Sequence, residues 1–276
     1  MPPTADAAER HVVHAYGVVA AGALDDAGSL LPPEGIGGSP VRLLPLSRLG
    51  VVVGDLDARR FGEAAWRAHA EDPAWLEPVA RGHHEVLRAV ASSVDVLPLR
   101  LPGIYGDDES LASLLGSEQE SLLERLHFVT GHEEWGVHVH LMAGATGGSS
   151  AAEATPAAAS GRDYLLRRKQ AVADRDTARE RRQQLLDEVC AALAGAATSS
   201  VLNQPQDRAL SGRDEPMLLN SAHLVPRRSR EEFFASADEV SRRLLEPEDL
   251  VMEISGPWPP YNFAAPGAAG EGEGAR

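Results

Sequence analysis

The stretch Asp249-Leu-Val-Met-Glu-Ile-Ser-Gly-Pro-Trp-Pro-Pro-Tyr-Asn-Phe263 begins with a β-strand pattern and ends in a proline-rich segment. Apolar side chains stand at every second position from Leu250 to Ile254, which is the period of a β-strand. Prolines crowd the positions that follow, and proline both forbids helix and removes backbone donors from a sheet. The stretch therefore predicts a strand that ends in a stiff, polyproline-like segment. Three aromatic residues belong to this segment: Trp258, Tyr261 and Phe263.

Two roles are open for this aromatic end. It can close a hydrophobic core behind the strand. Alternatively, it can offer a preformed contact to a partner protein, because a segment that is already stiff loses little entropy on binding. Trp258, Tyr261 and Phe263 are therefore candidates for protein contact.

A long helix is predicted upstream, from Gly161 to about Ala194. Its residues on a seven-residue spacing are Leu165, Val172, Arg179, Leu186 and Leu193. The middle of the helix is dense in charge. A helix that is apolar at its ends and charged in its middle is expected to project from the body of the protein, or to contact a partner only along a narrow apolar strip. We count Leu165, Val172 and Arg179 as further contact candidates.

The remaining apolar patterns complete an α+β chain. Strands are predicted over 12–21, 41–46, 50–56, 94–101, 133–142 and 216–225, and helices over 57–69, 72–90, 107–129 and 230–245. The residues from Asn203 to Glu215 are predicted to be a polar loop. The expected fold is two α+β domains, each a modified ferredoxin-like open sheet with helices on one face.

The boundary between the two domains is placed near Gly131. The predicted parts are an N-terminal domain over 1–131, a C-terminal domain over 132–263 with a low-complexity loop at 143–160 and a long helix over 161–195, and a disordered tail over 264–276.

Composition excludes several functions. The 276 residues carry a net charge of −15, which disfavours a nucleic-acid partner because phosphate binding needs a basic surface. No apolar run approaches the roughly 20 residues that span a bilayer, and the first residues lack the pattern of a signal peptide. The single cysteine, Cys190, excludes an internal disulfide. The cytoplasm is the expected compartment.

No catalytic, cofactor-binding or metal-binding residue is predicted. His138 and His140 share one face of a predicted strand with Glu134, yet no fourth ligand completes a zinc site. Arg100 is the only basic residue in its apolar run, where it either pairs with a buried carboxylate or marks the end of a strand. The alternative hypothesis is therefore a ligand-binding or metal-binding protein, or an enzyme, that uses Arg100, His138 and His140.

Six segments in order resemble the gas vesicle protein F/L family. They are Tyr16-Gly-Val-Val-Ala20, Asp72-Pro-Ala-Trp-Leu76 with Ala80-Arg-Gly-His83, Val96-Leu-Pro-Leu-Arg100, Glu133-Glu-Trp-Gly-Val137, Gly161-Arg-Asp-Tyr-Leu-Leu-Arg-Arg168 and Gly256-Pro-Trp-Pro-Pro-Tyr261. Two features depart from the family pattern. Leu101-Pro102-Gly103 stands where Phe-Gly-Thr is expected, and the residues from Ala143 to Ser160 resemble an insertion.

The resemblance implies a function as well as a fold. Members of this family are accessory or minor components of gas vesicle assembly, and their fold is described as two domains with modified ferredoxin-like sheets. The implied partners are the hydrophobic shell protein and other accessory proteins. The family has no catalytic residues to transfer to this chain. The implied location is the gas vesicle in the cytoplasm, and whether the protein remains in the mature vesicle is left open.

Overall fold

The computed structural model describes residues 11–24, 31–142, 161–206, 215–245 and 248–265, without the side chains of 161–166, 171 and 175. The loop predicted at 143–160 and most of the tail predicted at 264–276 lie outside the described residues. The chain divides into two compact units, Met1–Glu134 with Pro257–Arg276, and Trp135–Gly256. The division lies close to the predicted boundary. It differs from the prediction in assigning the residues after Gly256 to the first unit.

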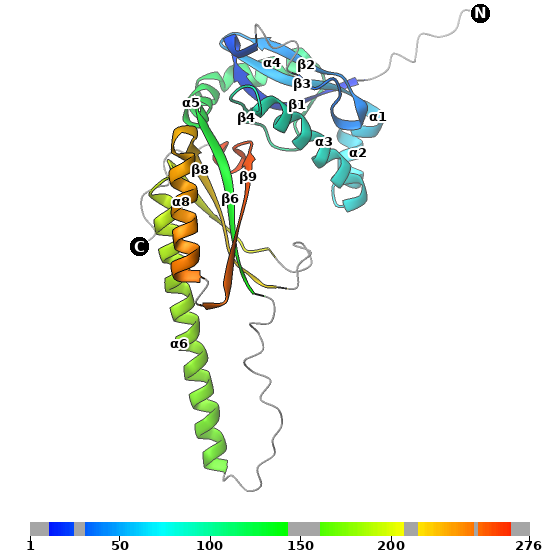
Figure 1. The fold of residues 1–276 in the computed structure, drawn as a ribbon. Coiled ribbons are helices and arrows are strands. Elements are labelled where there is room, and N and C mark those ends of the chain that lie inside the picture. Colours follow the sequence, from blue (N-terminus) through cyan, green and yellow to red (C-terminus); the bar gives the residue numbers. More distant parts are fainter. Residues whose placement is uncertain (1–10, 25–30, 143–160, 207–214, 246–247, 266–276) are drawn as a thin grey trace, which may run out of the picture. The chain divides into compact units, whose positions relative to one another are not determined.

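The first unit is built around a five-stranded sheet in the order β2-β3-β1-β4, with β5 also paired to β1. Its strands are β1 (His11–Ala20), β2 (Val41–Leu46), β3 (Leu49–Asp57), β4 (Leu97–Pro98) and β5 (Ile104–Tyr105). Its helices are α1 (Ala58–Phe61), α2 (Glu63–His69), α3 (Pro73–Ala91), α4 (Asp108–Ser117) and α5 (Gln119–Val129), with the short 3-10 helices η1 (Ala21–Leu24), η3 (Ile36–Gly38) and η8 (Tyr261–Phe263). Figure 1 labels most of these elements.

The first sheet is covered on both faces. Every residue of β1 from Val13 to Val19 is buried, and successive side chains of a strand point to opposite faces. Helix α3 covers the face that carries His14 and Tyr16. The buried leucines of α4 and α5 lie outside the α3 cluster, and α5 also contacts β1, so these helices cover the other face. The prediction of helices on one face only does not describe this sheet.

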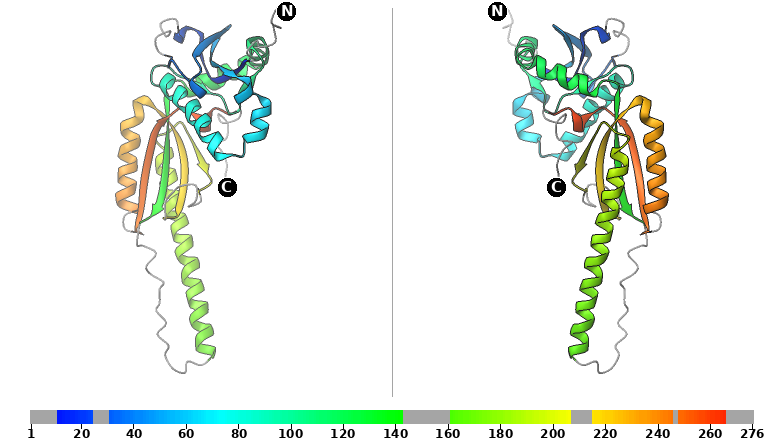
Figure 2. Two further views of the ribbon diagram at one scale, coloured as in Figure 1. Left: turned by 90° about the vertical axis from the view of Figure 1, so that its right-hand side faces the viewer. Right: turned by 90° about the vertical axis from the view of Figure 1, so that its left-hand side faces the viewer.

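The second unit is a four-stranded sheet in the order β7-β8-β6-β9. Its elements are β6 (His132–Leu141), α6 (Gly161–Ala194), β7 (Ser199–Asn203), β8 (Met217–Pro226), η5 (Arg227–Ser229), α8 (Arg230–Val240), a π-helical turn (Ser241–Leu245) and β9 (Leu250–Trp258). Helices α6 and α8 lie on the same side of the sheet in both figures (Figures 1 and 2). Their apolar side chains form one core with the strands, centred on Val137, Leu193 and Phe233.

Helix α6 has two different halves. Near its C-terminal end, Leu186, Val189 and Leu193 are buried in the core of the second unit. Toward its N-terminus the helix extends beyond the ends of the strands (Figure 1), and the described side chains from Arg167 to Glu180 are exposed. The expected projecting helix is therefore present with the predicted bounds.

Several predicted elements are shorter or divided. Of the strand predicted over 94–101, Leu97–Pro98 pairs with β1 as β4, and the Leu99 N–H donates to the Tyr16 carbonyl at 2.9 Å. The helix predicted over 107–129 breaks at Glu118, whose backbone leaves the helical region (φ −102, ψ 7). Strand β7 was not predicted, since its short polar sequence carries no alternating pattern. Its addition gives the second unit the order β-α-β-β-α-β of a split β-α-β sheet.

Candidate functional site

The aromatic segment after Gly256 packs within the first unit. Phe263 is fully buried, and Arg125 Nη1 donates a hydrogen bond of 2.7 Å to the carbonyl of Ala264. Tyr261 packs at the edge of the core between α3 and the sheet. Phe263 therefore belongs to the core, Tyr261 is half-buried, and Trp258 is the most exposed of the three aromatic residues, with 37% of its area exposed.

His84 on α3 anchors this segment. The Tyr261 hydroxyl lies 2.9 Å from His84 Nδ1, and the Trp258 ring lies 5.3 Å from the His84 ring between centroids. Burial raises the pKa of Tyr261, and the nearby Glu134 carboxylate raises it further. The hydroxyl therefore stays protonated and donates to an unprotonated His84 Nδ1, whose ring has its pKa lowered by burial. This bond fixes the segment next to an exposed indole.

A buried carboxylate holds the same segment from the other side. Glu134 is 3% exposed, and it accepts hydrogen bonds from the Asn262 backbone N–H at 2.9 Å and from the Asn262 side-chain amide at 2.7 Å. Burial raises the pKa of Glu134 to about 7, while the two bonds from Asn262 act in the opposite direction. Strand periodicity places Glu134 on one face with His138 and His140, and its pairing with Asn262 has no local signal in the sequence.

The contact candidates on α6 lie in its exposed half. Val172 is 49% exposed and Arg179 is also exposed. The side chain of Leu165 lies outside the described part of the structure. Near the start of the buried half, Arg181 donates to Glu248. This pair marks where α6 leaves the body of its unit, and Val172 and Arg179 belong to the free part of the helix.

The first unit contains a buried histidine pair, His14 and His83, and this pairing was not predicted. His83 Nε2 lies 3.1 Å from the Leu99 carbonyl, so it carries the proton and donates. His83 Nδ1 then accepts from His14 Nε2 at 3.0 Å. Burial lowers the pKa of His14 to about 3 and that of His83 to about 4. Both rings are therefore neutral near pH 7 and serve as polar parts of the core. His83 stacks on the Tyr16 ring, and His14 meets that ring edge-on.

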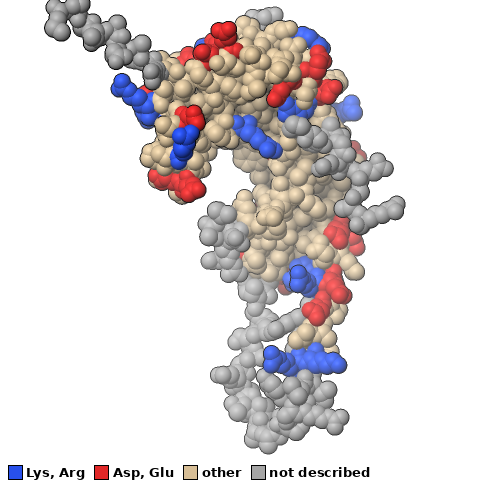
Figure 3. Space-filling view, turned by 180° about the vertical axis from the view of Figure 1, so that it is seen from behind, with Lys and Arg blue, Asp and Glu red and all other residues tan. Residues whose placement is uncertain are grey.

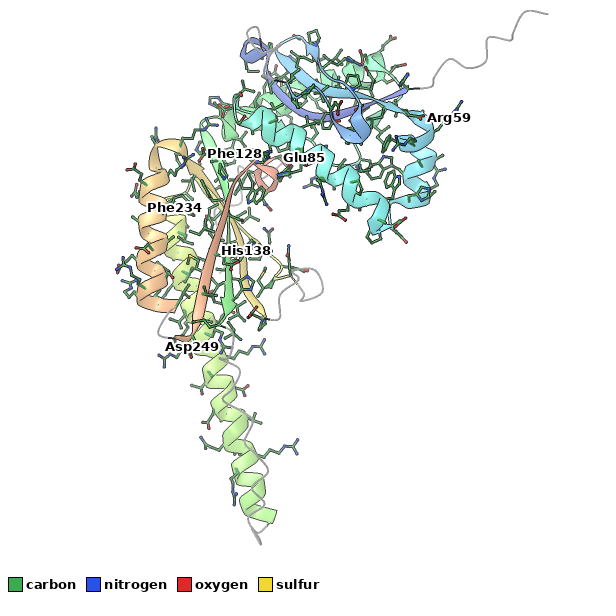
Figure 4. All side chains as sticks on the ribbon, turned by 45° about the vertical axis from the view of Figure 1, so that its right-hand side comes forward. Arg59, Glu85, Phe128, His138, Phe234 and Asp249 are labelled. Atoms are coloured by element: carbon green, nitrogen blue, oxygen red, sulfur yellow. The ribbon has the colours of Figure 1, made fainter. Side chains whose placement is uncertain are left out.

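The alternative site proposed around three residues is not assembled within either unit. His138 and His140 project from β6 in the second unit, with ring centroids 6.4 Å apart. Figure 4 shows His138 on the side of the sheet opposite Phe234 of α8. Arg100 belongs to the first unit and is exposed. Among the described residues, no three His, Cys, Asp or Glu side chains gather closely enough to hold a metal ion.

The described surface is mixed in charge. On the face in Figure 3, basic and acidic side chains are interspersed. Ion pairs also connect residues on the same helix, such as Arg67 with Glu63 on α2. Within the described ranges, none of the helices combines the length and hydropathy of a membrane span. The large apolar side chains exposed among the described residues are Leu114, Met142, Val172, Leu202, Val251 and Trp258.

Comparison with known sequences gives a consistent result. The profile of a family described as "Gas vesicle synthesis protein GvpL/GvpF" matches residues 12–265. The chain is 38% identical to gas vesicle protein L of Streptomyces sp. (strain CB03234) over 235 residues, which cover 84% of this chain and 85% of that protein. It is 28% identical to gas vesicle protein F of the same strain over 250 residues, covering 84% of this chain and 92% of that protein.

Solved structures share the fold. The crystal structure of the gas vesicle protein GvpF from Anabaena sp. PCC7120 superposes with a TM-score of 0.64 at 15% identity, covering 92% of this chain and 96% of that one. The GvpF structure from Microcystis aeruginosa gives a TM-score of 0.62 at 18% identity, with 92% and 99% covered. At these identities the likeness concerns the fold: mixed helices and sheets in an α+β arrangement.

Proposed function

The chain belongs to the gas vesicle synthesis protein GvpL/GvpF family, and on this premise we propose that it is a non-enzymatic accessory or minor structural protein of gas vesicle assembly. It acts in the cytoplasm, where it binds the hydrophobic shell protein and other accessory proteins. The family match from residue 12 to residue 265 carries this proposal, because it extends over both units and the aromatic C-terminal segment.

The physical role is to cover apolar surface. A hydrophobic shell subunit exposes such surface before it polymerises, and exposed apolar patches drive aggregation. A partner that presents rigid apolar groups can cover the patch and release it during growth. Trp258 suits this task because its segment is held by His84 and by Glu134, which accepts hydrogen bonds from Asn262, while the indole stays partly exposed. Val172 on the free half of α6 is the second candidate contact.

Co-purification with the shell protein tests the proposal. The wild-type chain is expected to retain the shell protein, and Trp258→Ala is expected to retain much less of it while remaining folded. Trp258 is 37% exposed and its ring packs near His84, so a melting curve checks that the variant is folded. The matched control is Leu202→Ala, which truncates another apolar side chain, 68% exposed, in the second unit. This control is expected to bind as the wild type does.

Two results would overturn the assembly role: no retention of the shell protein by the wild-type chain, together with normal vesicles after deletion of its gene. If Trp258→Ala unfolds, the indole belongs to the core, and the contact role passes to α6. Val172→Asp then tests that helix. A charge at this exposed position leaves the fold intact but disrupts an apolar contact between α6 and the shell protein. Probing vesicles after a urea wash separates a resident component from a transient chaperone.

A further inference from the structure

A pocket of about 320 Å³ lies in the first unit, between η3, the α1–α2 region and the start of α3. Its volume is at the lower end of the range for ligand sites, roughly 300–1,000 Å³. The walls are apolar and aromatic: Ile36, Phe61, His69, Trp75, Pro78 and Val79. Arg59 and Arg60 of α1 also line it, and Figure 4 shows the position of Arg59 on this helix.

The aromatic wall is fixed by packing within the unit. The Trp75 ring meets the Trp66 ring edge-on, with 4.9 Å between centroids, and stacks against His69 at 5.9 Å. Gly37 has a φ of +65, and a Cβ there would lie 2.9 Å from two atoms of the Phe61 ring. This close approach lets the η3 backbone form one side of the pocket. Because this site is already ordered, little conformational entropy is lost when a ligand binds.

The two arginines are the unusual feature of this pocket. The chain carries a net charge of −15, and neighbouring basic residues are paired, Arg67 with Glu63 and Arg81 with Glu77. By contrast, no carboxylate of the described residues lies within ion-pair distance of Arg59 or Arg60. The Arg60 guanidinium instead lies 5.0 Å from the centroid of the Phe61 ring. The pocket therefore presents positive charge beside an apolar cavity.

We propose that this pocket binds a short acidic peptide segment of a partner protein. In the complex a large apolar side chain of the peptide enters between Phe61 and Trp75, and a carboxylate beside it pairs with Arg59 and Arg60. The charges are complementary: guanidinium groups that have no carboxylate partner among the described residues match carboxylates with charge-assisted hydrogen bonds, and aromatic pockets hold the apolar anchors of peptides. The proposal does not depend on which protein Trp258 contacts.

A selection experiment on the full-length protein tests the proposal. A display library of random short peptides is selected on the wild-type chain, and enriched peptides are measured by calorimetry. The peptides are expected to carry Asp or Glu next to an aromatic or branched aliphatic residue. They are expected to bind the double variant Arg59→Ala, Arg60→Ala about tenfold more weakly, because charge-assisted bonds are lost. The matched control Arg67→Ala removes a charge from α2 outside the pocket and is expected to leave the affinity unchanged.

Two further arms sharpen the test. Ala65→Phe fills the pocket from α2 while both arginines remain, so it is expected to abolish binding; a melting curve confirms that the variant is folded. N-acetylphenylalanine is the second probe. If it binds as tightly as the selected peptides and with the same arginine dependence, the pocket is a small-molecule site and the peptide proposal is wrong. Enriched peptides without acidic residues, equal affinity for the double variant, or no enrichment would each overturn it.

Discussion

The Tyr16 hydroxyl shows how single residues position the elements of the first unit. It accepts a hydrogen bond of 3.0 Å from the Ile36 backbone N–H, which ties β1 to η3. Glycine is required beside it, because a Cβ on Gly35 would lie 2.2 Å from the hydroxyl oxygen and one on Gly54 would lie 3.0 Å from it. The buried Tyr16 hydroxyl is thus held in one position by the backbone of Gly35 and Gly54, which lies close around it.

This enclosure predicts a measurable coupling. Tyr16→Phe leaves the buried Ile36 amide without its acceptor and is expected to lower the free energy of unfolding by about 1–2 kcal/mol. Gly35→Ala places a methyl group against the hydroxyl, so it is expected to destabilise the wild type more than the Tyr16→Phe background. Urea denaturation of the four proteins measures the coupling. Strictly additive effects would show that the hydroxyl does not restrict position 35.

Glu134 predicts an unusual dependence of stability on pH. The folded pKa is raised from 4.5 to about 7, so the folded state holds a proton that the unfolded state has lost between these values. The cost of ionising the buried carboxyl is therefore fully present above pH 7 and disappears as the pH falls toward 4.5. Glu134→Gln removes this cost while keeping an acceptor for the Asn262 N–H. The variant is expected to be more stable at pH 8, by roughly 3 kcal/mol at most.

Melting curves at pH 8 and pH 5 check this sign. The advantage of Glu134→Gln is expected to be largest at pH 8 and to shrink toward pH 5. The control is Glu133→Gln, which changes the neighbouring carboxyl and is expected to give a smaller difference between the two pH values. A variant that loses stability at pH 8 would show that the bonds from Asn262 outweigh burial and that Glu134 is ionised in the folded protein.

At the scale of the elements, α6 joins a packed half to a free half in one continuous helix. Leu193 is fully buried while Val172 is 49% exposed. Leu193→Ala is expected to cost about 2–5 kcal/mol, through lost burial and a cavity. Val172→Ala is expected to leave stability unchanged, because alanine favours helix at an exposed position. Chemical denaturation measures both, and an equal loss in the two variants would mean that another element covers Val172.

Periodicity predicted the elements that carry long apolar patterns. Strands β2 and β3, the bounds of α6 and the extent of α3 were all readable, since each depends on residues close in sequence. Contacts between distant residues were not readable. The pairing of His14 with His83 and the bond from Asn262 to Glu134 arise only when the fold brings their segments together. Trp258 could be singled out because its flanking prolines mark it locally.

At the scale of the whole molecule, the chain leaves the first unit at Glu134 and returns to it at Pro257. The returning residues contribute to the fold of the first unit, because Phe263 is fully buried there and Asn262 satisfies the buried Glu134. Both ends of the second unit are therefore covalently joined to the first. The sequence pattern predicts that the whole aromatic end belongs to the second domain, since a strand and the segment that follows it are adjacent in the chain.

This return predicts which unit depends on the C-terminal segment. A chain that ends at Gly256 keeps most of β9 in the second sheet but removes Phe263 and the partner of Glu134. We expect hydrogen exchange to accelerate in β1 and α3 of the first unit, while β8 and α8 keep their protection. Phe263→Ala is the matched point variant, with an expected cost of about 3–5 kcal/mol in the same unit. Equal acceleration in both units would contradict the assignment, because it would mean that the segment stabilises the molecule as one cooperative body.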